Sequence, residues 1–140
     1  FIIGVLELIV MLIFSFIYFD IEITGSITSF ILLFTSGFFC FAGIAVVVSS
    51  RTSNTYIANG LINAVVMPMM LLSGIYFSYH NFPELAINFI KILPLTIFAD
   101  QARAIFIEGA GFVDSIQSIL ILFTTGTIFF FIGLKTFKWY

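Results

Sequence analysis

A few polar side chains lie inside long apolar runs, and they are the groups best placed to act on another molecule. Glu7 interrupts the first run, and an ionised carboxylate in hydrocarbon costs about 3 kcal/mol or more. At helical spacing it shares a face with Gly4, Met11, Ser15 and Tyr18. We therefore expect the acid to face other helices or a watery cavity. The alternative is that a neighbouring helix outside this chain pairs with it.

A second polar row lies in the third apolar run. Asn59 and Asn63, followed by Met67 and Met70, recur at spacings of four, four and three residues, which places them on one helical face. Interhelical hydrogen bonds of buried amides contribute about 0.6–2 kcal/mol each, so packing or dimerisation is favoured over substrate contact. Pro68 leaves one carbonyl unpaired and is a candidate hinge.

Recognised catalytic and nucleotide-binding patterns are missing from the sequence. It contains no G-x-x-x-x-G-K-[ST] loop, no H-E-x-x-H and no G-x-S-x-G, so this chain cannot hold nucleotide phosphates by the first route. The only histidine, His80, has Glu84 nearby but no further ligand cluster, which favours a solvated loop residue over a metal ligand. Cys40 is the only cysteine. We expect a protein that is not an enzyme, with no cofactor or metal in this chain; if ATP drives it, a partner subunit or a domain outside this sequence binds the ATP.

The elements that carry these side chains are expected to cross a membrane. Of the 140 residues 61% are hydrophobic and 9% charged, and the mean hydropathy is +1.23; soluble proteins are about one quarter charged. A bilayer-spanning helix needs about 20 apolar residues. The sequence predicts an all-α, polytopic helical bundle with four spans, at residues 1–19, 27–48, 57–77 and 115–134. On the second span, Ser36, Cys40 and Gly43 are small enough for close helix packing.

Residues 78–114 are too polar to span and too apolar for an ordinary loop. Apolar residues recur at helical spacing on both sides of Pro94, which predicts two short amphipathic helices broken by the proline. Such a pair would lie in the interface or dip into the membrane and return. Asp100 and Arg103 are three residues apart and can form an ion pair on the polar side of the second helix.

The cations indicate an orientation. Arg51, Lys135 and Lys138 lie on one side of a four-span arrangement, and Lys91 and Arg103 lie on the other. The excess of cations in short segments places the first set, and the C-terminus, in the cytoplasm. A net charge of −2 gives no basic surface for nucleic acid. Because the chain starts inside an apolar run without an initiator methionine, we expect it to be a fragment of a longer protein.

The second half of the sequence resembles a known family. The run Asn63-Ala-Val-Val-Met-Pro-Met-Met-Leu-Leu-Ser-Gly-Ile-Tyr-Phe77, then Phe82-Pro83, Leu93-Pro-Leu-Thr96, Asp100, Arg103 and Gly109, looks like the C-terminal part of the ABC type-2 permease domain. That family combines a proline-bearing span ending in Ser-Gly and an aromatic residue, an extracellular helical re-entry, and a final span. The first fifty residues match the family only in hydropathy.

The resemblance implies a function. Family members are export permeases for drugs, lipids, polysaccharides or peptides; they work as dimers, of like or unlike copies, on two cytosolic ATPase subunits at the inner (cytoplasmic) membrane. The four spans would be the third to sixth of six, residues 1–140 would be the C-terminal part of the transmembrane domain, and Arg51 would face the ATPase from a cytoplasmic loop. We expect a hydrophobic or amphipathic substrate. A non-transporting membrane scaffold is the alternative, and a membrane enzyme ranks third.

Overall fold

A computed structural model describes residues 2–19, 24–50, 52, 54–76 and 82–136, and every regular element in that part of the chain is helical. The order is α1 (Ile2–Phe19), α2 (Ile27–Ser49), α3 (Thr55–Leu72), α4 (Glu84–Ile90), α5 (Pro94–Arg103), the π-helical turn η2 (Ala104–Glu108) and α6 (Phe112–Thr136). Among the described residues there is no strand, so the all-α prediction is confirmed.

Local sequence signals explain where these helices begin and end. The Ser26 side chain accepts a hydrogen bond from the amide of Ser29 at the start of α2, and Asn54 Oδ1 accepts one from Tyr56 at the start of α3. Both are ordinary N-caps. Pro94 opens α5, where a missing amide hydrogen costs nothing. Gly109 ends η2 with a left-handed φ of 73°, a conformation in which glycine avoids a side-chain clash.

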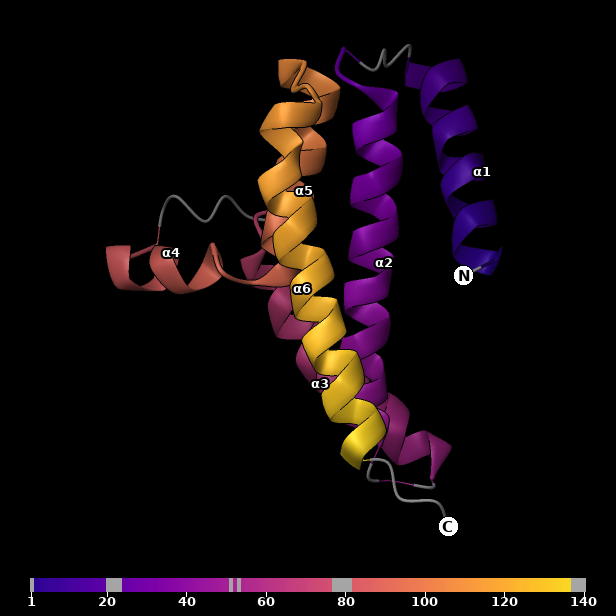
Figure 1. The fold of residues 1–140 in the computed structure, drawn as a ribbon, viewed down its shortest axis with the longest axis vertical. Helices are drawn as coiled ribbons and strands as arrows, with labels where there is room; N and C mark the ends of the chain where they lie inside the picture. Colours follow the sequence, from indigo (N-terminus) through magenta and orange to yellow (C-terminus); the bar gives the residue numbers. More distant parts are fainter. Residues whose placement is uncertain (1, 20–23, 51, 53, 77–81, 137–140) are drawn as a thin grey trace.

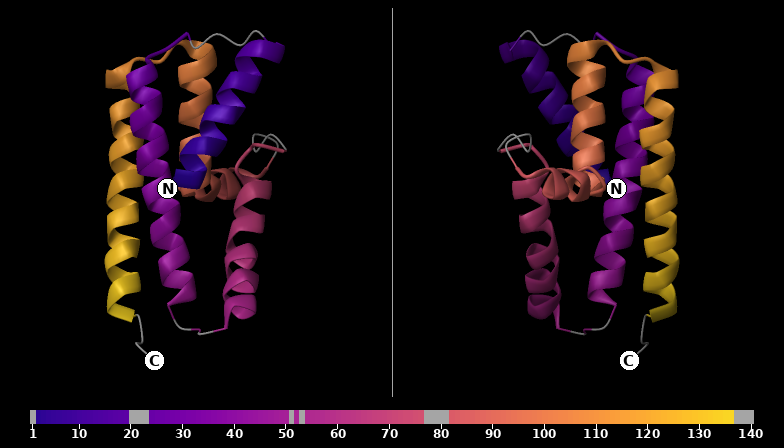
Figure 2. Two further views of the ribbon diagram at one scale, coloured as in Figure 1. Left: turned by 90° about the vertical axis from the view of Figure 1, so that its right-hand side faces the viewer. Right: turned by 90° about the vertical axis from the view of Figure 1, so that its left-hand side faces the viewer.

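The chain runs down the bundle, climbs back in two stages and runs down again (Figures 1 and 2). α2 descends, α3 climbs beside the lower part of α2, and α5 with η2 climbs beside the upper part. α4 lies between the two stages, across the long axis of the bundle. Because the chain returns to the upper end before α6 starts, α6 descends parallel to α2.

The parallel pair α2 and α6 is the best packed part of the molecule, and glycines bring the two backbones together. A Cβ on Gly43 would lie 2.7 Å from the Gly126 carbonyl oxygen, and one on Gly126 would lie 2.8 Å from Cys40 Cα. A Cβ on Gly133 would lie 3.0 Å from the Val47 amide nitrogen. Such small residues let helices approach closely in a membrane. The packing expected for Ser36, Cys40 and Gly43 is found, since all three are buried.

Phenylalanine rings and leucines complete the interior around this contact. The Phe39 ring stacks on Phe123 with centroids 5.4 Å apart, and Phe30 meets Phe106 edge-on at 4.9 Å. The buried cluster also contains Leu33, Cys40, Ile105 and Leu122. Aromatic pairs in these geometries add about 0.5–1.5 kcal/mol beyond their buried area. The upper part of the bundle is therefore held by α2, η2 and α6 together.

Length and hydropathy confirm the predicted class of polytopic membrane bundle. α2, α3 and α6 are each long and apolar enough to cross a bilayer, and the described part of α1, Ile2–Tyr18, is apolar but shorter. The proline-broken pair, Glu84–Ile90 and Pro94–Glu108, is bent by 85°. The helix in the third predicted span ends at Leu72, earlier than residue 77, because the chain turns at Gly74, whose φ is 79°.

Gly126→Ala should destabilise the protein by about 1–3 kcal/mol, the usual cost of forcing extra volume into a packed core, because the new Cβ would meet the α2 backbone at 2.8 Å. The matched control is Gly60→Ala on α3, where a Cβ meets nothing within 4 Å and alanine favours the helix. Thermal unfolding in detergent should show a lower melting temperature for the first variant alone. Equal melting temperatures would contradict the glycine contact.

Candidate functional site

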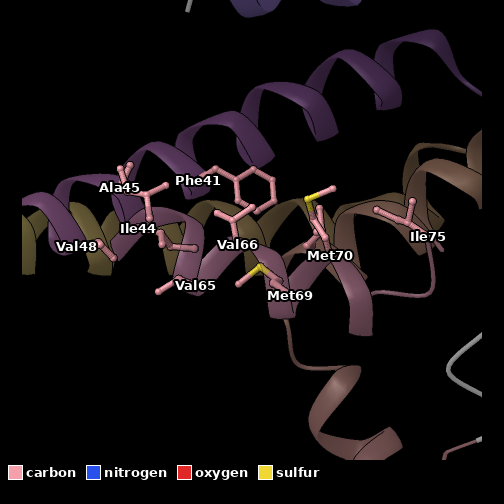
Figure 3. Close-up of a pocket in the computed structure, with 11 residues that line it drawn as sticks. Phe41, Ile44, Ala45, Val48, Val65, Val66, Met69, Met70 and Ile75 are labelled. Atoms are coloured by element: carbon pink, nitrogen blue, oxygen red, sulfur yellow. The ribbon is translucent and has the colours of Figure 1, made fainter. Parts of the chain in front are cut away.

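α3 stands apart from the rest of the bundle. None of its residues is buried, and an apolar cavity of about 370 Å³ separates it from α2. Figure 3 shows the side chains of the two helices pointing toward one another across this space. The lining from α2 is Phe41, Ile44, Ala45 and Val48; that from α3 is Ile62, Val65, Val66, Met69 and Met70, with Ile75 and Leu95 at the upper end.

The apolar gap continues beyond this cavity. A second hollow of about 220 Å³ shares Ile44, Val48, Val65 and Met69 with the first and reaches Pro94 and Phe129. A space lined only by aliphatic, thioether and aromatic groups offers no partner to a buried polar group and accepts apolar molecules. Methionine adds adaptability, because its unbranched thioether side chain fits irregular shapes. The gap between α2 and α3 is therefore suited to an apolar chain or ring.

The predicted polar row of α3 runs along the flank of the cavity. Successive helical residues are rotated by about 100°, so Asn59, Asn63 and Met67 lie beside the cavity-lining face; all three are exposed. Met70 belongs to both faces, since it also lines the cavity. Within the described part of the chain, neither asparagine amide has a hydrogen-bond partner. Unpaired amides in lipid are costly, so this face requires a polar neighbour or water.

Pro68 lies within α3, which continues through it to Leu72. Proline lacks the amide hydrogen that would bond to the carbonyl of residue 64, and the next turn is intact because the Ser73 amide donates to the Met69 carbonyl at 2.9 Å. The helix above and below the proline is thus regular. The hinge role of Pro68 stays a prediction.

Glu7 is exposed on α1 and does not lie on its packed face. The side chains of Leu8 and Leu12 pack against the core, and a Cβ on Gly4 would meet the Phe38 ring at 2.9 Å. The residues that share the predicted face with Glu7 are divided: Gly4 and Ser15 are half-buried, whereas Met11 and Tyr18 are exposed. Inside this chain, no described helix covers Glu7.

The broken segment holds its predicted ion pair. Arg103 Nη1 donates to Asp100 Oδ1 at 2.9 Å, and Pro94 opens the helix that carries both. Gln101 between them was not singled out by the sequence, yet its amide joins α5 to α6. Nε2 donates to Ser115 Oγ at 3.0 Å, and Oε1 accepts from Ser118 Oγ at 2.9 Å.

A second set of hydrogen bonds joins the broken segment to the α1–α2 connection, and we call it the upper clamp. Thr24 Oγ1 donates to the Phe106 carbonyl at 2.9 Å; the Gly25 amide donates to Ile105 at 3.0 Å, and the Ser26 amide to Ala110 at 3.3 Å. The last carbonyls of a helix lack intrahelical partners, and here the connection supplies donors. A Cβ on Gly25 would lie 2.6 Å from two of these oxygens.

Sequence signals for the missed residues were weak. Gly126 and Gly133 are seven residues apart on α6, a spacing that could have indicated a packing face. Gly25 and Gln101 lie in polar surroundings that give no such signal. Arg51, the predicted ATPase-facing residue, and His80 lie outside the described residues.

Comparison with known proteins gives a consistent assignment. The sequence model described as "ABC-2 type transporter" matches residues 1–107, so the match includes the first fifty residues, whose motifs alone indicate only shared hydropathy. The inner membrane transport permease YhhJ of Escherichia coli (strain K12) is 28% identical over 118 residues, which are 84% of this chain and 32% of that protein. The probable multidrug ABC transporter permease YbhS of the same strain is 26% identical over 138 residues, 96% of this chain and 36% of that protein.

The chain therefore spans about a third of the length of the curated relatives that it matches. No solved structure matches this chain.

Filling the cavity between α2 and α3 should abolish binding of a small apolar molecule. Val66→Trp places an indole in a space of about 370 Å³. The affinity of the purified protein for an environment-sensitive apolar dye should therefore fall by about tenfold or more, because the dye loses apolar surface that it would bury in the cavity. Leu61→Trp is the matched control, because Leu61 is 45% exposed and does not line the cavity. Equal dye affinity in the two variants would show that the dye binds elsewhere.

Proposed function

Because the chain belongs to the ABC-2 type transporter family, we propose that it forms part of the permease subunit of an ATP-driven exporter for a hydrophobic or amphipathic substrate. The observation that carries this proposal is the apolar gap between α2 and α3, flanked by the exposed amides of Asn59 and Asn63. An amphipathic molecule meets both environments there. The name of the relative YbhS, a probable multidrug permease, is compatible with such a substrate.

The proposed substrate class follows from the lining. The cavity offers only apolar groups, which suits a lipid tail or a planar apolar drug and excludes tight binding of a bare sugar or ion. Asn63 supplies both donors and an acceptor from the adjacent face. One polar group on an otherwise apolar substrate would be oriented by this amide.

The proposed partners are a cytosolic ABC ATPase and a second permease copy in the inner membrane. The exposed face of Asn59, Asn63 and Met67, and the exposed Glu7 on α1, are the surfaces that require a neighbour. The lower end of the bundle, where α2 ends, α3 starts and α6 ends (Figure 2), would be cytoplasmic and would carry the C-terminus. Arg51 would meet the ATPase at this end.

A non-transporting scaffold is the second candidate, and the same two asparagines favour it if their amides only bond to another helix. Interhelical amide bonds stabilise membrane assemblies by about 0.6–2 kcal/mol each. Under this alternative, the apolar gap holds lipid and serves no pathway. Transport measurements on substituted proteins separate the two.

The full-length protein should co-purify with an ATPase that carries a Walker motif and should raise the turnover of that ATPase. The physical reason is that the sequence of this chain contains no G-x-x-x-x-G-K-[ST] motif, so in the proposed exporter a bound partner would supply the ATP site. Affinity purification from native membranes, followed by an ATPase assay with and without the permease, measures both effects. A permease that purifies without any ATPase would refute the exporter.

Asn63→Ala and Glu7→Gln should each lower efflux of an amphipathic dye several-fold while membrane abundance stays unchanged, since each removes a polar group that faces outward from the chain. Leu61→Ala is the control: its side chain is exposed on the opposite face of α3, and efflux should be unaffected. Efflux from intact cells is divided by the amount of protein in the membrane. If abundance falls and efflux per molecule does not, the scaffold is the better account.

A further inference from the structure

A polar groove of about 700 Å³ lies between the broken segment and α6, separate from the apolar cavity beside α3. It is set among residues that cross or border the membrane, and its walls are charged and amide-bearing. The residues that matter here are Lys91, Asp100, Arg103, Glu108, Gln117 and Ser118. Two of them are cations and two are anions, so the groove is close to neutral but strongly polar.

The surroundings of the groove are apolar. Ile121 lines it and is 41% exposed, and its neighbour Leu120 on α6 is 57% exposed. On η2, Ile107 next to Glu108 is 72% exposed. Charged groups beside hydrocarbon are costly unless water or an opposite charge covers them. A molecule with a polar head and apolar chains would satisfy both the groove and its rim.

Arg103 has the capacity to bind a phosphate without giving up its partner. One nitrogen, Nη1, donates to Asp100 at 2.9 Å, and a guanidinium carries five N–H donors in a planar fork. The remaining donors suit a phosphate, which guanidinium groups bind with two parallel hydrogen bonds. The side chain is 46% exposed, so an incoming anion can reach it.

Glu108 supplies the complementary charge. It follows Arg103 by five residues, and both side chains line the groove. Within the described part of the chain Glu108 forms no ion pair, and its side chain is exposed. An anion on Arg103 and a cation on Glu108 would therefore be held side by side in one groove.

We propose that this groove binds the head group of a zwitterionic phospholipid, with the phosphate on Arg103, the ammonium on Glu108 and the acyl chains along Ile121 and Leu120. Lys91 also lines the groove and adds a second cation to its walls. The lipid would belong to the leaflet at the upper end of the bundle, where η2 and the first turns of α6 lie (Figure 1). The proposal does not depend on transport or on an ATPase.

Native mass spectrometry of the delipidated full-length protein tests the proposal, with phosphatidylethanolamine and phosphatidylglycerol added at equal concentrations. The wild type should prefer the zwitterionic lipid. Glu108→Gln should lower that preference by about threefold or more, the scale of one solvent-exposed charge contact, because only the ammonium contact is lost. Arg103→Gln should weaken binding of both lipids, and Arg103→Lys should restore part of it.

Glu84→Gln is the matched control, because Glu84 is an exposed acid on α4 that does not line the groove; it should leave the preference unchanged. Melting temperatures of all variants identify any that fail to fold, and Glu108→Gln does not disturb the Asp100–Arg103 pair. Displacement of the lipid by equimolar inorganic phosphate would overturn the proposal in favour of a soluble-anion site. Equal binding of both lipids by wild type and variants would also overturn it.

Discussion

The close parallel contact of α2 and α6 is the interaction on which the rest of the structure depends. Parallel neighbours cannot be joined by a short turn, so the chain must return to the upper end before α6 begins. It does so through α3, the transverse α4 and the ascending α5 (Figure 2). Because lipid is as apolar as leucine, helices associate in a membrane through close packing rather than through water exclusion. Close packing is possible here because Gly43, Gly126 and Gly133 have no side chain that would hold the two backbones apart.

The upper and lower parts of the bundle differ because their contacts differ. In the upper part α5 packs on α2, with the Phe98 ring against Gly37; Gln101 joins α6, and the upper clamp ties η2 to the α1–α2 connection. Three helices and one connection are thereby fixed together. In the lower part α3 faces an apolar gap and buries no residue. The apolar gap that we propose as the substrate site therefore lies where the helices pack least closely, since a filled interior leaves no space for a ligand.

The sequence predicted what run length, proline and charge spacing determine. The apolar runs predicted the helices, and Pro94 predicted the break in the segment that follows α3. The spacing of three residues predicted the ion pair between Asp100 and Arg103. The third helix ended early because a single glycine with positive φ, Gly74, stops it, and hydropathy does not detect that. Which face of a helix packs was harder to predict: Leu8 and Leu12 of α1 pack against the core, while Glu7, expected to face other helices or a watery cavity, is exposed within this chain. Tertiary contacts such as the upper clamp depend on segments about 80 residues apart, and local patterns carry no information on them.

The weak anchoring of α3 has a mechanical consequence if the protein is the exporter that we propose. A substrate or an ATPase shifts an equilibrium between two arrangements only as far as it binds them differently. The element that moves must therefore have few contacts to lose, and α3 meets this condition, whereas α6 does not. Pro68 lowers the cost of bending within α3 by removing one backbone hydrogen bond.

The ends of α3 are held differently: Met69 and Met70 near its upper end line the cavity together with Leu95 of α5, while its N-terminal residues Thr55, Tyr56 and Ile57 are exposed. A displacement that starts at the lower end would change the width of the α2–α3 gap and leave the clamped upper part in place.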